Sequence, residues 1–150
     1  MSAFVTAGGG FLLAVLWFDL MFDVQVLGHQ GEEELPEEVL ASIAAYYARV
    51  TTAARPMNRL IAAVMAGTLA AIVVEIVRGV EHPWVPWVSL GFALAAIGLA
   101  GVRTVPGAVR LGGRGDAVGV QSSLARSVLR EHLFCAGSIA GLVVLQLAAG

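Results

Sequence analysis

Four long apolar stretches decide what this chain can fold into. They run over about residues 3–27, 57–78, 84–103 and 131–149. At 1.5 Å of rise per residue, helices of these lengths cross the ~30 Å hydrocarbon core of a bilayer and satisfy their own backbone hydrogen bonds in lipid. Charged residues make up only 13% of the chain, about half the share in a soluble domain. The sequence therefore predicts an all-α integral membrane four-helix bundle, with residues 1–150 forming a single four-span domain.

Two further stretches predict helices outside the membrane. Apolar residues recur at helical spacing between about residues 36 and 55, with glutamates at the start and arginines towards the end, as the helix dipole favours. Residues 118–130 carry a weaker apolar stripe ahead of the fourth span. We expect both to be amphipathic cytoplasmic extensions, which precede the second and fourth spans. The stretch 106–119, rich in glycine and arginine, is expected to be a mobile connecting loop.

The positive charges predict the orientation in the membrane. The chain has nine arginines and no lysine, and all the arginines except Arg78 lie on one side of the four expected spans. By the positive-inside rule, both termini lie outside and the two long connections are cytoplasmic, in a multi-pass protein of a bacterial inner (plasma) membrane. The chain has no basic cluster of the kind that binds nucleic acid, so the lipid bilayer is the expected partner.

The few polar residues within the spans predict a site at the cytoplasmic end. Asp19 and Asp23 are four residues apart and share one face of the first span. A carboxylate in hydrocarbon is costly unless it is paired, protonated or facing water. His132 and Cys135 share a face of the fourth span at the same depth. We expect Asp19, Asp23 and His132 to be catalytic, with an aspartate as base and His132 as acid or ligand, and these three with Cys135 are candidate ligands of a metal such as Zn or Fe.

Other polar residues are candidates for substrate binding or charge pairing. The set comprises Asn58, Arg59, Arg103, Arg130 and Glu75. In the purely structural alternative, Arg59, Arg103 or Arg130 pairs with the aspartates and only fixes helix packing. Glu75 lies near the outer end of the second span, where we expect it to reach the membrane interface or to pair with Arg78 at i+3.

Small residues predict close contacts between helices. Gly137 and Gly141 form a G-x-x-x-G pattern on the fourth span, and Gly91 and Gly98 lie on one face of the third. Such faces pack helices within one chain, or join the chain to a second copy or to another membrane protein.

Two short motifs carry a family resemblance. The segments A-R-P-M-N-R (Ala54 to Arg59) and L-R-E-H-L (Leu129 to Leu133), in a four-span plan with a cytoplasmic helix, resemble the four-helix anthrone-oxygenase-like family of bacterial integral membrane domains. The activity named in that family is oxidation of polyketide anthrones. The resemblance implies a role for Asn58 and His132, the positions that match. It does not identify a cofactor, so the cofactor is unknown at this point.

Three functions from different classes are consistent with these features. The first is a membrane-embedded oxidoreductase or oxygenase that acts on a small apolar substrate at the cytoplasmic-side polar site. The second is a non-enzymatic accessory or assembly subunit of a membrane complex. The third is a small proton-coupled transporter, which needs a water path from the aspartates to Glu75.

Overall fold

The computed structural model describes residues 2–53 and 55–149, and these residues fold into helices without strands. A 3-10 segment and two π-helical segments extend the α-helices. The elements are α1 (Ser2–Asp23), η1 (Val24–His29), α2 (Glu37–Tyr47), η2 (Ala48–Ala53), α3 (Arg55–Arg78), α4 (Trp84–Leu99), η3 (Ala100–Thr104), α5 (Val105–Gly113) and α6 (Val118–Ala149).

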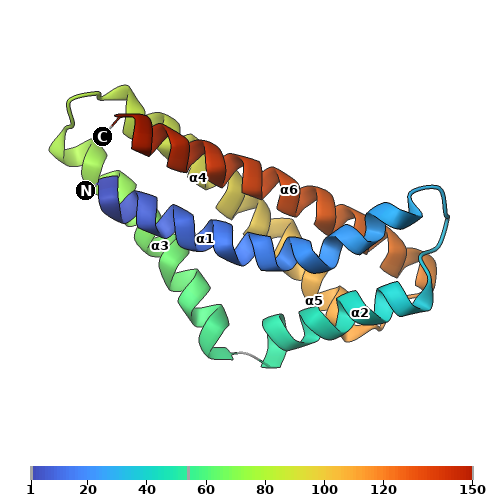
Figure 1. The fold of residues 1–150 in the computed structure, drawn as a ribbon. Coiled ribbons are helices and arrows are strands. Elements are labelled where there is room, and N and C mark those ends of the chain that lie inside the picture. The colour runs from blue at the N-terminus through green and yellow to red at the C-terminus, as the bar shows by residue number, and fades with distance from the viewer. Residues whose placement is uncertain (1, 54, 150) are drawn as a thin grey trace.

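Four helical runs are long and apolar enough to cross a membrane. They are Ala3–His29, Pro56–Arg78, Trp84–Gly113 and Val118–Ala149. α1 and α4 both pack against α6 and against α3, and the ends of the chain lie together at one end of the bundle (Figure 1). The four apolar helices predicted from the sequence are confirmed.

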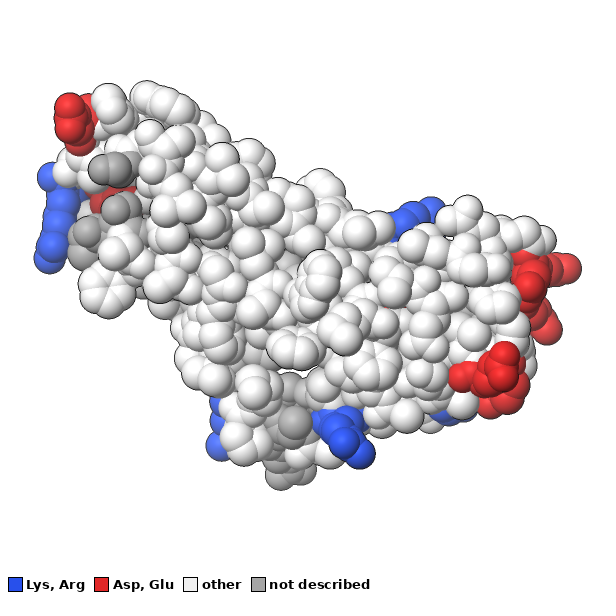
Figure 2. Space-filling model, in the orientation of Figure 1, with Lys and Arg blue, Asp and Glu red and all other residues white. Residues whose placement is uncertain are grey.

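The long helices form one layer of the molecule, here termed the bundle layer. It consists of α1, α3, α4 and the C-terminal half of α6, and many of its large apolar side chains point outward. Figure 2 shows a broad surface almost free of charge over the bundle layer, with charged residues towards both of its ends. The buried core of this layer consists of Val5, Leu12, Ala71, Ile72, Ala93, Ala96, Cys135, Ile139 and Leu142.

A second layer, here termed the α2 layer, has its own core. It consists of η1, α2, α5 and the N-terminal half of α6. The apolar face of α2 lies on α5 and α6, as its helical spacing predicts. Its buried residues are Val26, Leu35, Val39, Leu40, Ile43, Tyr47, Ala108, Leu111, Ala125, Val128 and Leu129.

The expected loop over residues 106–119 is wrong in its first part, because residues 105–113 form the helix α5 and only residues 114–117 connect it to α6. The helix of α4 continues through η3 into α5 and ends at Gly113, where Arg114 adopts a left-handed conformation (φ 51°). Glycine disfavours helix only weakly, by about 1 kcal/mol per residue, and burial of Ala108 and Leu111 against α2 and α6 outweighs that cost. Tertiary packing therefore overrides the local glycine signal.

The α1–α2 connection is held by α6. The Arg126 guanidinium donates to three backbone carbonyls, those of His29 (3.4 Å), Glu32 (2.6 Å) and Glu33 (3.1 Å). The Leu35 amide donates to the Ser122 hydroxyl at 2.9 Å. These contacts fix the position of α2 relative to α1 and α6.

The glycines predicted at helix contacts divide into two groups. Gly141 faces the ring of Phe92 on α4, so that a Cβ there would lie 3.2 Å from the ring. Gly91, Gly98 and Gly137 have no described atom of another element within 4 Å of a Cβ position. Gly141 thus packs within the chain, and the other three remain candidates for contacts with a partner.

Gly112 provides a test of how closely α5 must approach α2. A Cβ at Gly112 would lie 2.6 Å from the Ala48 backbone nitrogen, whereas a Cβ at Gly113 would meet nothing within 4 Å. We expect Gly112→Ala to lower the free energy of unfolding by roughly 1–3 kcal/mol, because two backbones must separate. Gly113→Ala is the matched control and should change stability little. Thermal unfolding in detergent measures both, and equal effects of the two variants would contradict the packing.

Candidate functional site: an aspartate, histidine and tyrosine cluster

Three helices bring five polar side chains together where the two layers meet. Asp19 and Asp23 lie one turn apart near the end of α1, and His132 lies in the middle of α6. The last turn of α2 adds Tyr46 and Tyr47. The three predicted catalytic residues therefore lie together, and two tyrosines complete the cluster.

Asp23 is the most deeply buried charge of the cluster, with only 1% of its surface exposed. Its Oδ1 accepts a hydrogen bond from the Tyr47 hydroxyl at 2.6 Å, and its Oδ2 lies 2.6 Å from Nδ1 of His132. A carboxylate accepts and cannot donate, so the proton on Nδ1 points at Asp23. Asp23 therefore fixes the orientation of the imidazole and leaves Nε2 as its other reactive nitrogen.

Asp19 faces this second nitrogen of His132. Its Oδ1 accepts from the Tyr46 hydroxyl at 2.7 Å, while its Oδ2 lies 3.7 Å from Nε2 of His132. That separation exceeds a hydrogen bond, and the Asp19 side chain is 15% exposed against 1% for Asp23. Asp19 therefore lies on the more exposed side of the cluster, here termed its open side.

The two tyrosines act as fixed donors. Burial raises the pKa of both Tyr46 and Tyr47 above the ordinary value, and the neighbouring aspartates raise it further. Both phenols therefore stay protonated at neutral pH. The Tyr46 ring also stacks on Phe22, with centroids 4.1 Å apart and planes at 11°.

The arginines predicted to pair with the aspartates do not do so within the described part of the chain. Arg103 pairs with Glu131 at 3.3 Å and is mostly exposed. Arg59 and Arg130 are exposed on the surface. Neutral phenols and one imidazole bind the carboxylates, so no guanidinium is buried. Burying a charged guanidinium would cost more desolvation free energy than burying a phenol.

The other predicted ligands are occupied elsewhere. The Cys135 thiol donates to the Ala96 carbonyl at 3.4 Å, on the side of α6 that faces α4. Among the described residues, no group of three or more His, Cys, Asp and Glu side chains has the geometry of a metal site. The Asn58 amide donates to the Thr51 carbonyl at 2.7 Å, so it holds the turn between η2 and α3.

Glu75 lies at the other end of the bundle, and its expected pairing with Arg78 is wrong. Glu75 is buried and accepts a hydrogen bond from the Gln146 amide at 3.2 Å. Arg78, the last residue of α3, is exposed. The hydrogen-bond donor to Glu75 therefore comes from α6 and not from α3 itself.

Sequence reasoning missed the role of Tyr46 and Tyr47, because it assigned both to an apolar stripe. Their position within that stripe is correct, since Tyr47 belongs to the core of the α2 layer. A signal was nevertheless present: a buried tyrosine hydroxyl needs a hydrogen-bond partner, and the unpaired aspartates offered one. Comparison of the chain with models of known families, with curated proteins and with solved structures found no significant match.

The chain has only two tyrosines, so their titration reports on the cluster. A folded-state pKa above the unfolded value means that these groups stabilise the fold below about pH 10 and that the stability is lost as pH rises further. Ultraviolet absorbance should show no tyrosinate at about pH 10 in folded protein, and about half-ionisation of each phenol on unfolding at that pH. Tyr46→Phe should halve the unfolding signal. Titration of a phenol at its ordinary pKa in folded protein would contradict the buried hydrogen bonds.

Proposed function

We propose that this protein is a membrane-embedded enzyme that carries out acid–base chemistry on a small apolar substrate, of the oxidoreductase or oxygenase type. The observation that carries the proposal is the state of His132. Its Nδ1 is held by Asp23, and its Nε2 faces Asp19 across 3.7 Å without a hydrogen bond. An imidazole fixed on one side and free on the other is how a general base is held.

His132, Asp23 and Asp19 have different roles in the proposed proton transfer. When the imidazole is neutral with its proton on Nδ1, the lone pair on Nε2 accepts a proton from the substrate. Asp23 stabilises the imidazolium that results, because its carboxylate is buried and desolvated. Asp19, which is partly exposed, then takes the proton from Nε2 or passes it to water.

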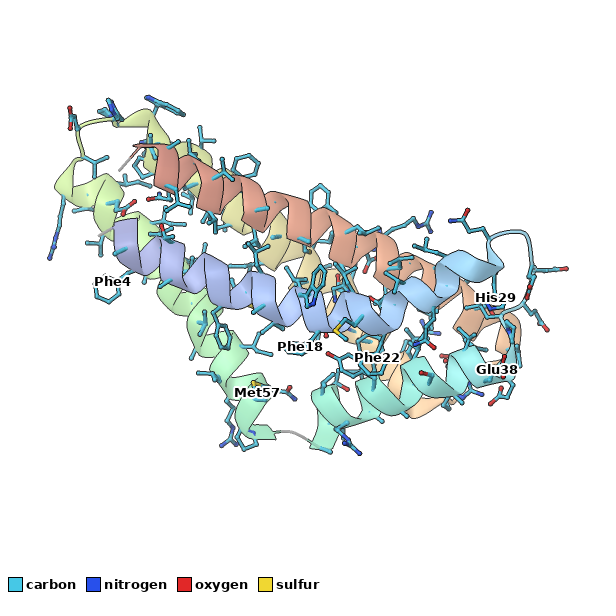
Figure 3. The ribbon with its side chains drawn as sticks, viewed as in Figure 1. Phe4, Phe18, Phe22, His29, Glu38 and Met57 are labelled. Carbon is cyan, nitrogen blue, oxygen red and sulfur yellow. The ribbon has the colours of Figure 1, made fainter. Side chains whose placement is uncertain are left out.

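The surroundings of Asp19 favour an apolar substrate. On α1, Trp17, Phe18 and Met21 are exposed next to it. Figure 3 shows Phe18 and Phe22 on the side of α1 that faces α2 and the start of α3, where Met57 lies. A substrate dissolved in lipid reaches the open side of the cluster along this apolar surface.

The resemblance to the anthrone-oxygenase-like family suggests a substrate. The methylene group of an anthrone lies between two aromatic rings opposite a ketone, so its proton is acidic and suits removal by His132. Dioxygen is the co-reactant and accepts the electrons: the methylene and O₂ give a ketone and water, with both hydrogens leaving in the water. Asn58, the other position that matches the family, joins the start of α3 to η2 through the Thr51 carbonyl.

The transporter alternative has less support. It needs a polar path from His132 to Glu75, and between them lie the buried apolar side chains of Leu12, Ile139 and Leu142. No contact of the described residues specifically favours an accessory subunit. The enzyme is therefore the function that we propose.

The anthrone reaction tests the role of His132. Purified protein in detergent is given anthrone in aerated buffer, and anthraquinone is measured. Wild type should form anthraquinone, and His132→Gln should be slower by roughly 10²–10⁴-fold. Asp19→Asn should also be slow. Cys135→Ser, one turn further along the same helix, is the matched control and should retain the wild-type rate.

Two results would contradict the proposal. One is an unchanged rate in His132→Gln protein whose melting temperature matches that of wild type. The other is a loss of rate in every variant in proportion to its loss of stability, which would mean that the cluster only holds the helices together.

The arginines support an orientation with both termini outside and the α2 layer in the cytoplasm. Apart from Arg78, the arginines lie in the α2 layer or where it meets the bundle layer. A C-terminal alkaline phosphatase fusion should be active and a C-terminal green fluorescent protein fusion dark in bacterial cells. A fusion at Arg78 should behave as the C-terminal fusion does, because both positions lie outside in this topology, and the reverse pattern of fusion activity would invert the topology.

A further inference from the structure

A second polar group is buried at the opposite end of the bundle from His132. Glu75 of α3, Ser89 of α4 and Gln146 of α6 are each at most 3% exposed. The Gln146 amide nitrogen donates to Oε2 of Glu75 at 3.2 Å and to the Ser89 hydroxyl at 3.0 Å. Three helices are thus joined through one amide group.

This group has more hydrogen-bond acceptors than donors. A glutamine amide has two N–H donors, and Gln146 uses both. The carbonyl oxygen of Gln146 and Oε1 of Glu75 remain as acceptors. Within residues 2–53 and 55–149, no arginine or histidine forms an ion pair with Glu75. Neither Glu75 nor Gln146 has a fully enclosed oxygen without a partner among the described residues, and both line the same opening, so their free oxygens can accept hydrogen bonds from a ligand that enters it.

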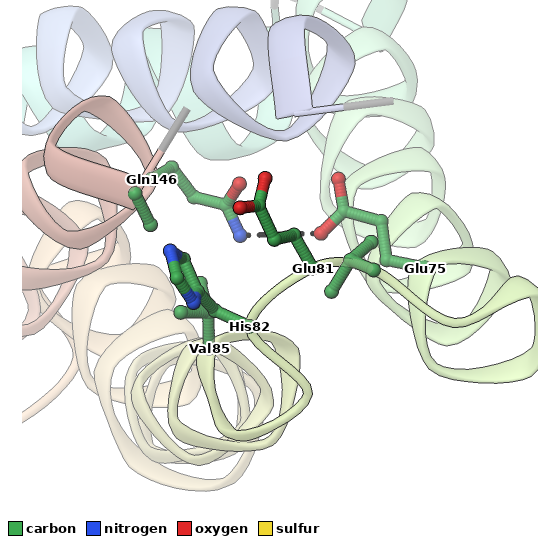
Figure 4. A pocket seen from close by; sticks show the side chains of 7 residues that line it. Glu75, Glu81, His82, Val85 and Gln146 are labelled. Atoms are coloured by element: carbon green, nitrogen blue, oxygen red, sulfur yellow. Dashed lines mark hydrogen bonds between the residues drawn. The ribbon is translucent and has the colours of Figure 1, made fainter.

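A pocket of about 60 Å³ opens beside these acceptors. Figure 4 shows the carboxylates of Glu75 and Glu81 and the amide of Gln146 around the same opening, with His82 at its edge. Apolar side chains complete the lining, namely Val80, Val85 and Ala149. The pocket therefore combines negative charge, acceptors without donors, and an apolar wall.

We propose that this pocket binds the ammonium group of a small alkylamine. An ammonium group has three N–H donors, and Glu75, Gln146 and Glu81 offer three acceptors around one opening. The apolar wall contacts the first methylene groups of the alkyl chain. A divalent metal fits less well, because the described His, Cys, Asp and Glu side chains form no group with metal-site geometry.

Two sources supply this chemistry at the end of a membrane bundle. One is a free short amine in solution, and the other is the ethanolamine headgroup of a phospholipid. Trp84 and Trp87 are exposed in the first turn of α4, next to the lining residue Val85, which is where a lipid headgroup region would lie. The alkylammonium is common to both sources.

Thermal unfolding in detergent tests the binding. A ligand that binds only the folded state raises the melting temperature, so ethylammonium chloride should raise that of the full chain. Tetramethylammonium has the same charge but no N–H, and it should raise the melting temperature far less. Glu75→Gln should bind ethylammonium at least roughly 10-fold more weakly, since a charged hydrogen bond is lost.

Two further variants keep the test independent of folding. Glu81 is exposed, so Glu81→Gln should leave stability unchanged. The substitution should weaken ethylammonium binding, because it removes a carboxylate that lines the pocket. Glu38→Gln, an exposed glutamate in the α2 layer, should bind as wild type does. Equal stabilisation by both salts, or undiminished binding in both Glu75→Gln and Glu81→Gln, would overturn the proposal.

Vesicles distinguish the two sources. The protein is placed in phosphatidylethanolamine with phosphatidylglycerol, and separately in phosphatidylcholine with phosphatidylglycerol. If the ethanolamine headgroup is the ligand, the first mixture raises the melting temperature and weakens ethylammonium binding, with both effects absent in Glu75→Gln. If ethylammonium stabilises the protein equally in both mixtures, the ligand is a soluble amine. If neither ethylammonium nor phosphatidylethanolamine stabilises the protein, the pocket does not bind an ammonium group.

Discussion

The structure depends on the burial of one carboxylate, that of Asp23. At 1% exposure it is stable only with donors at both oxygens, and these come from Tyr47 on α2 and His132 on α6. The donors lie 24 and 109 residues away in sequence, so the carboxylate is satisfied only when three separate segments have come together. A buried charge left unpaired costs more than a typical hydrogen bond contributes. The same contacts therefore align the two layers and hold the imidazole in a fixed orientation.

The two layers are held together by different contacts. In the bundle layer, helices meet through small residues such as Gly8 beside Thr68 and Gly9 beside Val143. In the α2 layer, a compact apolar core joins η1, α2, α5 and α6. Ion pairs at the surface of this layer, such as Arg114 with Glu37 and Arg110 with Asp116, add little stability. The cluster lies where the two layers meet.

The sequence predicted the features that depend on local pattern. The four apolar helices follow from length and hydropathy, and the approach of Asp19, Asp23 and His132 follows from helical rise once the spans are placed. The features that depend on contacts between distant segments escaped prediction. Burial of Ala108 and Leu111 turned an apparent glycine loop into α5, and Glu131 lies closer to Arg103 than the aspartates do. No spacing within one helix could reveal that Gln146 would donate to Glu75, since 71 residues separate them.

The two buried carboxylate groups of this chain lead to opposite chemistry. Asp23 receives donors from the protein itself, so it holds an imidazole in place and leaves Nε2 of His132 to react. Among the described residues, Glu75 receives one amide donor, so it keeps acceptors for the ligand that we propose. The first arrangement suits proton transfer, because a base works best when its partner is already fixed. The second arrangement suits the binding of a cation, because a carboxylate without a positively charged partner attracts a cationic ligand most strongly. The difference is set by how many donors the surrounding helices supply to each carboxylate.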